Sequence, residues 1–146
     1  MKTHKWDKIY PYLILFVFMS ASIILSIRHE LWFDEARAWA IGASSTSFKD
    51  FAGFMSEGEG HPYLWSGILL VFYRFITSKV EVIKIIHLLI SFTGVFLFLK
   101  YSAFNKIIKT LFEFSYLIFY EYSIISRNYA LGILFIYVFC ILYRNK

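Results

Sequence analysis

Long apolar stretches of this chain alternate with short charged ones. Four stretches are long enough, once their flanks are counted, to cross a bilayer: 10–27, 84–100, 110–125 and 128–143. A transmembrane helix needs about 20 predominantly apolar residues, with a usual range of about 17 to 25. The pattern therefore predicts an all-α polytopic membrane protein with about four transmembrane helices.

A fifth apolar run, Tyr63 to Tyr73, contains only 11 uncharged residues before Arg74. This length favours an interfacial or re-entrant helix over a membrane span. If the run does not span, one face collects the lysines of the N-terminus, those between 100 and 109, and the basic C-terminus. The positive-inside rule makes that face cytoplasmic. A spanning run would instead turn the lysines between 100 and 109 outward, so we prefer four spans with a cytoplasmic N-terminus.

The segment 28–83 then forms an outer loop after the first span. Apolar residues from Leu31 to Ile41 recur with helical spacing, which predicts a short amphipathic helix lying on the bilayer. A second short helix is predicted over 48–55, and a turn over 58–62. Pro62 is well placed to begin the helix at Tyr63, because the first turn of a helix needs no N–H there.

Composition supports a membrane protein. The 146 residues are 59% hydrophobic and 22% aromatic, with a mean hydropathy of +0.60, more apolar surface than one soluble core of this size can hide. The net charge of +5 comes from cations scattered at the ends of apolar runs, which indicates topology rather than nucleic-acid binding. We expect an integral, multi-pass plasma-membrane protein whose first helix is a retained signal anchor, not a cleaved signal peptide.

Two adjacent carboxylates, Asp34 and Glu35, follow the first span. They lie between Trp32 and Trp39, an aromatic setting typical of the membrane boundary. Neighbouring side chains on a helix diverge by about 100°, so one acid is expected to act and the other to support it. A carboxylate near apolar surface can serve as a general base. The alternative is a solvated loop acid, with Asp34 as a helix N-cap.

Three further candidates are predicted to serve a phosphate-binding site with Tyr129. Arg127 joins two spans on the same face as Asp34, and its guanidinium can bind two oxygens of a lipid phosphate, although an anchoring cation would also suit that place. His61 precedes Pro62 on that face and can bind a phosphate or hydroxyl, or simply form a turn. Glu121 is an intramembrane carboxylate one turn from Arg127, a functional candidate by default.

Other polar residues are expected to be structural. We predict that His87 is a hydrogen-bonded interhelical residue, that His29 is solvated or interfacial, and that Glu113 pairs with Lys109. The sequence shows no Cys/His metal pattern and no glycine-rich phosphate loop. Cys140 is the single cysteine, which excludes an intramolecular disulfide.

The ordered set of these pieces resembles a known family. It consists of Phe33-Asp34-Glu35-Ala36, then His61-Pro62-Tyr63-Leu64, a second span near 82–101, and Arg127-Asn128-Tyr129-Ala130-Leu131. The set resembles the N-terminal part of the GT-C superfamily of membrane glycosyltransferases, especially the family-39-like group with protein mannosyltransferases and the aminoarabinose transferases of lipid A. The resemblance covers nearly the whole chain but only the first third or less of a typical member.

The resemblance implies that Asp34 is the acceptor-activating base, supported by Glu35, and that the donor is a polyprenyl-phosphate-linked sugar. The acceptor would lie outside the cytoplasm. Tyr63 replaces the second proline of the family element, and no aspartate follows Arg127 as it does in some relatives, so a divalent metal is left open. The family's later spans are absent, which implies a truncated or split copy whose partner chain supplies them.

The sequence therefore predicts glycosyl transfer from a lipid-linked donor on the extracytoplasmic face. One alternative is a non-catalytic membrane subunit that serves assembly or lipid binding. Another is a small proton-coupled transporter that uses Glu121 and His87 as a relay.

Overall fold

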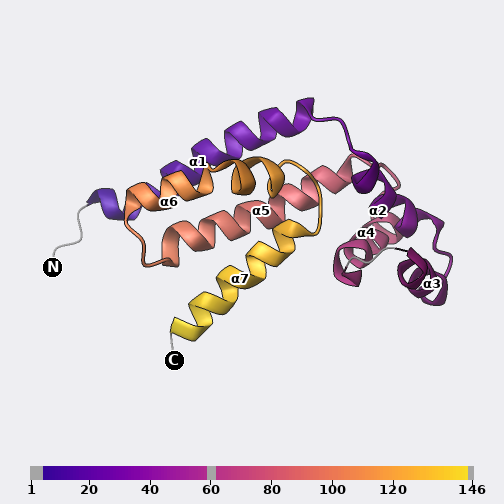
Figure 1. Cartoon of the computed structure of the whole chain (residues 1–146). Coiled ribbons are helices and arrows are strands. Elements are labelled where there is room, and N and C mark those ends of the chain that lie inside the picture. The colour runs from indigo at the N-terminus through magenta and orange to yellow at the C-terminus, as the bar shows by residue number, and fades with distance from the viewer. Residues whose placement is uncertain (1–4, 59–61, 145–146) are drawn as a thin grey trace.

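The computed structural model describes residues 5–58 and 62–144, and within these ranges every regular element is helical (Figure 1). The elements are α1 (Lys5–Arg28), α2 (Phe33–Ser44), α3 (Phe48–Gly58), α4 (Tyr63–Phe75), α5 (Val82–Tyr101), α6 (Lys106–Glu113), the π-helix η1 (Tyr116–Glu121) and α7 (Tyr129–Arg144). The predicted all-α class is confirmed.

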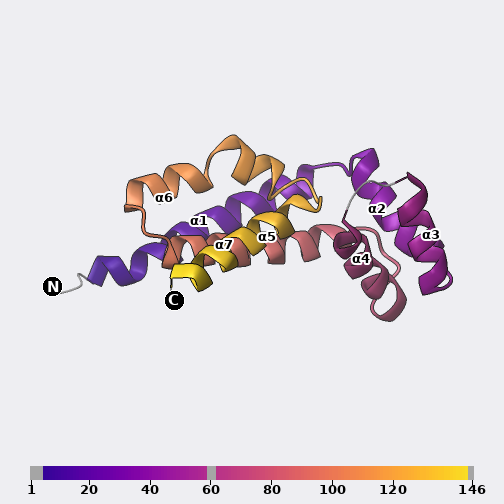
Figure 2. The same cartoon turned by 60° about the horizontal axis from the view of Figure 1, so that its bottom comes forward.

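The helices form two groups. One group is an elongated bundle in which α5 packs between α1 and α7, with α6 and η1 along its side (Figures 1 and 2). The other is a cluster of the short helices α2, α3 and α4 at one end of the bundle, where α2 packs on α4. Successive long elements run in opposite directions, so the turn between η1 and α7 returns to the end that carries the cluster.

Two helices, α1 and α5, are long and apolar enough to cross a membrane. They coincide with the first two predicted spans. The helix at the fourth predicted span, α7, is apolar but only 16 residues long. The structure therefore supports two candidate spans, and the prediction of four spans is not confirmed.

The predicted continuous helix over 110–125 is interrupted. α6 ends at Glu113, and the chain resumes at Tyr116 as a π-helix in which Tyr122 N donates to Leu117 O at 2.9 Å. The Ser123 hydroxyl donates to Ile118 O at 2.7 Å. In a regular helix this carbonyl would accept a backbone N–H instead. Such local bonds compete with the helical ladder, a competition that apolar content alone does not predict.

The segment 28–83 contains short helices where they were expected. α3 begins with a reciprocal pair of bonds between Ser47 and Asp50, each side chain accepting the backbone N–H of the other at 3.1 Å. α2 lies close to α4 at Gly42, where a Cβ atom would come within 3.2 Å of the Leu70 backbone. The contact is centred on buried Trp39, Trp65 and Leu69, which makes this segment a packed unit rather than a loose loop.

Cations fasten the bundle at both ends. Beside the short-helix cluster, Lys84 Nζ donates to Ser26 O at 2.9 Å and to His29 O, and so ties the start of α5 to the end of α1. At the opposite end, three contacts join the termini of α1, α5, α6 and α7. Lys106 binds Asp7, Lys109 donates to Leu99 O, and Arg144 donates to Tyr101 O. The predicted partner of Lys109 was Glu113, but its ammonium binds the Leu99 carbonyl, a natural cation site at the end of α5.

Candidate functional site

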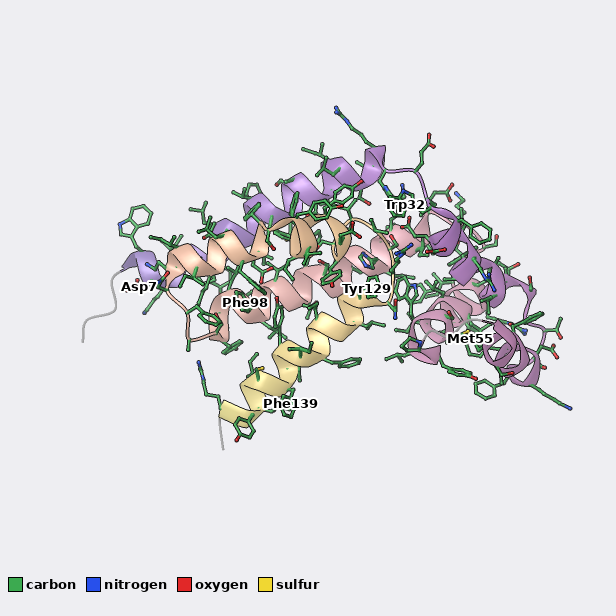
Figure 3. The ribbon with its side chains drawn as sticks, viewed as in Figure 1. Asp7, Trp32, Met55, Phe98, Tyr129 and Phe139 are labelled. Carbon is green, nitrogen blue, oxygen red and sulfur yellow. The ribbon has the colours of Figure 1, made fainter. Side chains whose placement is uncertain are left out.

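Asp34 and Arg127 meet at the junction between the bundle and the short-helix cluster. Asp34 lies in the first turn of α2, Arg127 lies in the turn before α7, and their side chains form an ion pair. The Arg127 guanidinium lies over the Trp32 ring, with 5.6 Å between the guanidinium carbon and the ring centroid. Figure 3 labels Trp32, just before α2, and Tyr129, at the start of α7. The structure thus brings together the acid and the arginine that the sequence singled out.

Glu35 occupies a different environment from its neighbour. Its side chain is completely buried, whereas the side chain of Asp34 is 51% exposed. The Glu35 carboxylate accepts backbone N–H groups from Trp32 at 2.8 Å and from Ser126 at 2.6 Å. The first bond is the usual reach of a third-position glutamate back to the N-cap of its helix, and the second crosses to the turn before α7. Glu35 therefore holds α2 against that turn, while Asp34 is free to face solvent.

His29 supplies the third partner of Glu35. Its Nε2 lies 2.8 Å from Glu35 Oε2, and its side chain is only 6% exposed. A solvated His29 is therefore ruled out, because its ring is bound to Glu35 and lies near the Trp32 ring, whereas an interfacial position stays a prediction. No spacing rule predicts this pair, since it depends on how the chain turns between α1 and α2.

A cavity of about 90 Å³ lies at the Asp34–Arg127 pair. Its walls come from three parts of the chain, α2, α4 and the turn before α7, and include Asp34, Trp65, Ser126, Arg127 and Tyr129. The volume suits a small polar group, such as a phosphate, rather than a whole sugar. The cavity combines one half-exposed carboxylate with one guanidinium, the pairing needed for a base beside an anion-binding group.

An apolar groove of about 310 Å³ adjoins this cavity and shares Trp65 and Tyr129 with it. The groove follows the face of α7 that carries Leu131, Gly132 and Ile136. A polar cavity that opens beside an apolar groove matches an amphiphile with a charged head and a hydrocarbon tail.

Of the other residues that the sequence singled out, only Tyr129 lines the cavity within the described part of the chain. Tyr129 lines both the cavity and the groove, and its ring packs against Tyr122 with centroids 5.3 Å apart. Glu121 lines neither and instead accepts a hydrogen bond from the Tyr116 hydroxyl at 2.6 Å. His61 lies outside the described residues, although its neighbour Pro62 lines both spaces.

Sequence reasoning missed Trp65 and Ser126, whose positions at the cavity depend on tertiary packing. It also took His87 for a satisfied interhelical residue. The His87 side chain is completely buried, and its ring lies near the backbone of Ser123 and Arg127. The ring also packs edge-on against Trp65 of α4, with centroids 5.8 Å apart. The predicted interhelical position is confirmed.

Metal binding receives no support from clustering: in residues 5–58 and 62–144, no three His, Cys, Asp or Glu side chains gather closely enough to hold an ion. No family model, no curated protein and no solved structure matches this chain. The candidate function therefore depends on the geometry around Asp34 and Arg127.

Proposed function

We propose that this chain forms the acceptor-base and donor-phosphate half of a GT-C-type glycosyltransferase site that uses a polyprenyl-phosphate-linked sugar. The supporting observation is that Asp34 and Arg127 share one cavity, which continues into an apolar groove. In this assignment Arg127 binds the donor phosphate, the groove takes the first part of the lipid, and Asp34 faces the acceptor.

The chemistry follows from these positions. Asp34 takes the proton of an acceptor hydroxyl or amine, and the acceptor attacks the anomeric carbon of the sugar. The bond from that carbon to the phosphate oxygen breaks, and its electron pair remains on the phosphate. Arg127 stabilises this growing negative charge, with its guanidinium held in place by the Trp32 ring. Glu35 supports the site by fixing α2 to the turn that carries Arg127.

We place this chain in the plasma membrane, with α1 and α5 as spans and the site on the extracytoplasmic side. Lys106, Lys109 and Arg144 fasten the end of the bundle opposite to the site, and cations favour the cytoplasmic side. A cavity of about 90 Å³ does not enclose a sugar. In this proposal, helices of a partner chain complete the donor pocket.

A non-catalytic lipid-binding subunit is the second candidate. It is favoured by the ion pair itself, because the Asp34 oxygen that is bound to Arg127 is not available to take a proton from an acceptor. Proton-coupled transport has less support, because Glu121 is bonded to Tyr116 and lines neither the cavity nor the groove.

The test is sugar transfer in membranes that contain the full chain and its natural partners, with a panel of radiolabelled polyprenyl-phosphate hexoses as donors. Asp34→Asn should reduce transfer by about 10² to 10⁴-fold, the usual contribution of a general base. Glu30→Gln is the matched control, since Glu30 is an exposed acid in the connection that precedes α2, and it should leave transfer unchanged. Full transfer by Asp34→Asn would rule out the proposed base and leave the lipid-binding alternative.

Arginine substitutions test the donor side. Arg127→Gln should abolish transfer, and Arg127→Lys should restore only part of it, because an ammonium lacks the planar fork of the guanidinium. Arg28→Gln, at an exposed arginine near the same end of the bundle, is the control. Equal activity of Arg127→Lys and wild type would show that a point charge is enough and that two-oxygen recognition plays no part.

A further inference from the structure

Three residues that line the cavity each carry a buried hydrogen-bond donor. The donor atoms are Trp65 Nε1, Ser126 Oγ and Arg127 Nε, and none makes a hydrogen bond within the residues that the structure describes. The residues that carry them all line the cavity, and Trp65 and Ser126 are 4% and 0% exposed. Buried donors are nearly always paired in folded proteins, so three unpaired donors around one cavity indicate a ligand that accepts hydrogen bonds.

The donor set indicates an anion. An indole and a guanidinium can only donate, and a hydroxyl can also do so. The cavity is also lined by Asn128 and Tyr129, where the 16-residue helix α7 begins. The first N–H groups of a helix have no intrahelical partner and carry a partial positive charge, a setting that favours phosphate.

Asp34 occupies the same cavity and is bound to Arg127. Its carboxylate is half exposed, so water competes with Arg127 for it, and this competition limits what the ion pair contributes to stability. An incoming phosphate carries equal or greater charge and has more donors available to it. It is therefore expected to replace the carboxylate on Arg127.

We propose that the cavity is an oxyanion site in which a phosphate group accepts hydrogen bonds from Trp65, Ser126 and Arg127 and displaces Asp34 from Arg127. The origin of that phosphate in a lipid-linked sugar rests on the proposed function. If the donor is such a lipid, its binding frees Asp34 to act on the acceptor. The base then becomes available only when the donor is in place.

The direct test is calorimetric titration of the full chain in non-ionic detergent micelles. The probes are inorganic phosphate, farnesyl phosphate and, as the phosphate-free control, farnesol. Trp65→Phe and Ser126→Ala should each weaken phosphate binding about tenfold, the usual effect of losing one hydrogen bond to a charged group. Ser126→Ala keeps the backbone bond to Glu35, and Trp65→Phe keeps an aromatic ring in place but removes the donor and some volume.

Two matched controls separate ligand contact from folding. Trp39→Phe alters another buried indole of the same hydrophobic cluster, and Ser22→Ala removes another buried hydroxyl that has no partner in the described chain. Neither residue lines the cavity, so both variants should bind phosphate as wild type does. If all four variants bind phosphate equally, the proposed oxyanion site is overturned.

Asp34→Asn tests the displacement. Removing a competitor held by about 0.5 to 1 kcal/mol, converted at 1.4 kcal/mol for each factor of ten, should tighten phosphate binding about twofold to fivefold. Unchanged or weaker binding would overturn the displacement. The titration measures binding alone, so the two proposals can fail separately. If Asp34→Asn binds phosphate more tightly and also transfers sugar normally, the proposed base is refuted and the oxyanion site is supported.

The probes also distinguish the source of the phosphate. Tighter binding of farnesyl phosphate than of inorganic phosphate supports a lipid headgroup whose chain enters the groove along α7. Equal affinity for the two, with farnesol not binding, supports a site for free phosphate. In both cases the losses in Trp65→Phe and Ser126→Ala are required.

Discussion

Substitution of Glu35 should destabilise the protein far more than the same substitution of Asp34. Glu35→Gln removes one negative charge from a fully buried carboxylate that accepts two backbone N–H groups and the His29 ring. An amide has one acceptor oxygen, so at least one of these donors would face an NH₂ group. Asp34→Asn removes the same charge from a half-exposed partner of Arg127.

The expected magnitudes follow from burial. Hydrogen bonds to charged groups contribute about 1.5 to 3 kcal/mol each, and leaving a buried donor unpaired costs a further 1 to 3 kcal/mol. Glu35→Gln should therefore lower the free energy of unfolding by about 3 kcal/mol or more. Asp34→Asn should change it by less than about 1 kcal/mol, since exposed ion pairs contribute little.

Equilibrium unfolding by SDS in mixed micelles measures both values, and limited proteolysis between α1 and α5 shows which part loosens. In Glu35→Gln the segment that contains α2 should be cut faster, because its bond to Ser126 N is lost. Similar losses of stability in the two variants would refute the anchoring role of Glu35. A loss confined to Asp34→Asn would reverse the assignment of the two acids.

Three further outcomes are expected. Gly42→Ala should destabilise the α2–α4 contact by about 1 to 2 kcal/mol in thermal unfolding, because its Cβ would lie 3.2 Å from the Leu70 backbone. Gly53→Ala has open space around it and should stabilise α3 by up to about 1 kcal/mol. Hydrogen bonds with the side chains of Thr46 and Ser47 keep the pKa of Asp50 below 3.8. The ionised Asp50 therefore stabilises α3 above that pH, and this stabilisation is lost as the pH falls further. The hydrogen-exchange rates of α3 in wild type and in Asp50→Asn should become equal in acid. In a Cys140→Ala background, single cysteines at 34 and 127 should react with an impermeant reagent from outside the cell, and one at 104 only from inside; opposite labelling of 34 and 127 would contradict the proposed topology.

Helix content and the positions of the long helices follow from the apolar pattern, because length and hydropathy are local properties. α1 and α5 lie where the first two apolar stretches predicted them. The interruption after Glu113 was not predicted, because the stretch 110–125 is largely apolar and its only charged residues are two glutamates. Its shape depends on hydrogen bonds of individual side chains, such as that of Ser123 to Ile118 O.

The candidate site was predictable in its charged members only. Asp34 and Arg127 stand out because an acid and an arginine at the membrane boundary suit a base and a phosphate-binding group, and the alternation of helix directions brings them to one end. Trp65, Ser126 and His29 have no such signal. An aromatic residue in an apolar helix, a serine in a turn and a histidine at a helix end are all common, and only the packing of α4 and the 122–128 turn gives them their neighbours.

The Glu35 bond to Ser126 also bears on the order in which the protein is made. The two residues are 91 positions apart, which at a synthesis rate of about 5 to 20 residues per second corresponds to about 5 to 18 s. Through that interval the Glu35 carboxylate has no Ser126 N–H to bind, and for the later part of it α2 is already outside the ribosome. The junction that holds Asp34 beside Arg127 therefore cannot close until the turn before α7 has been made, and α2 waits for those seconds with an unpaired acid.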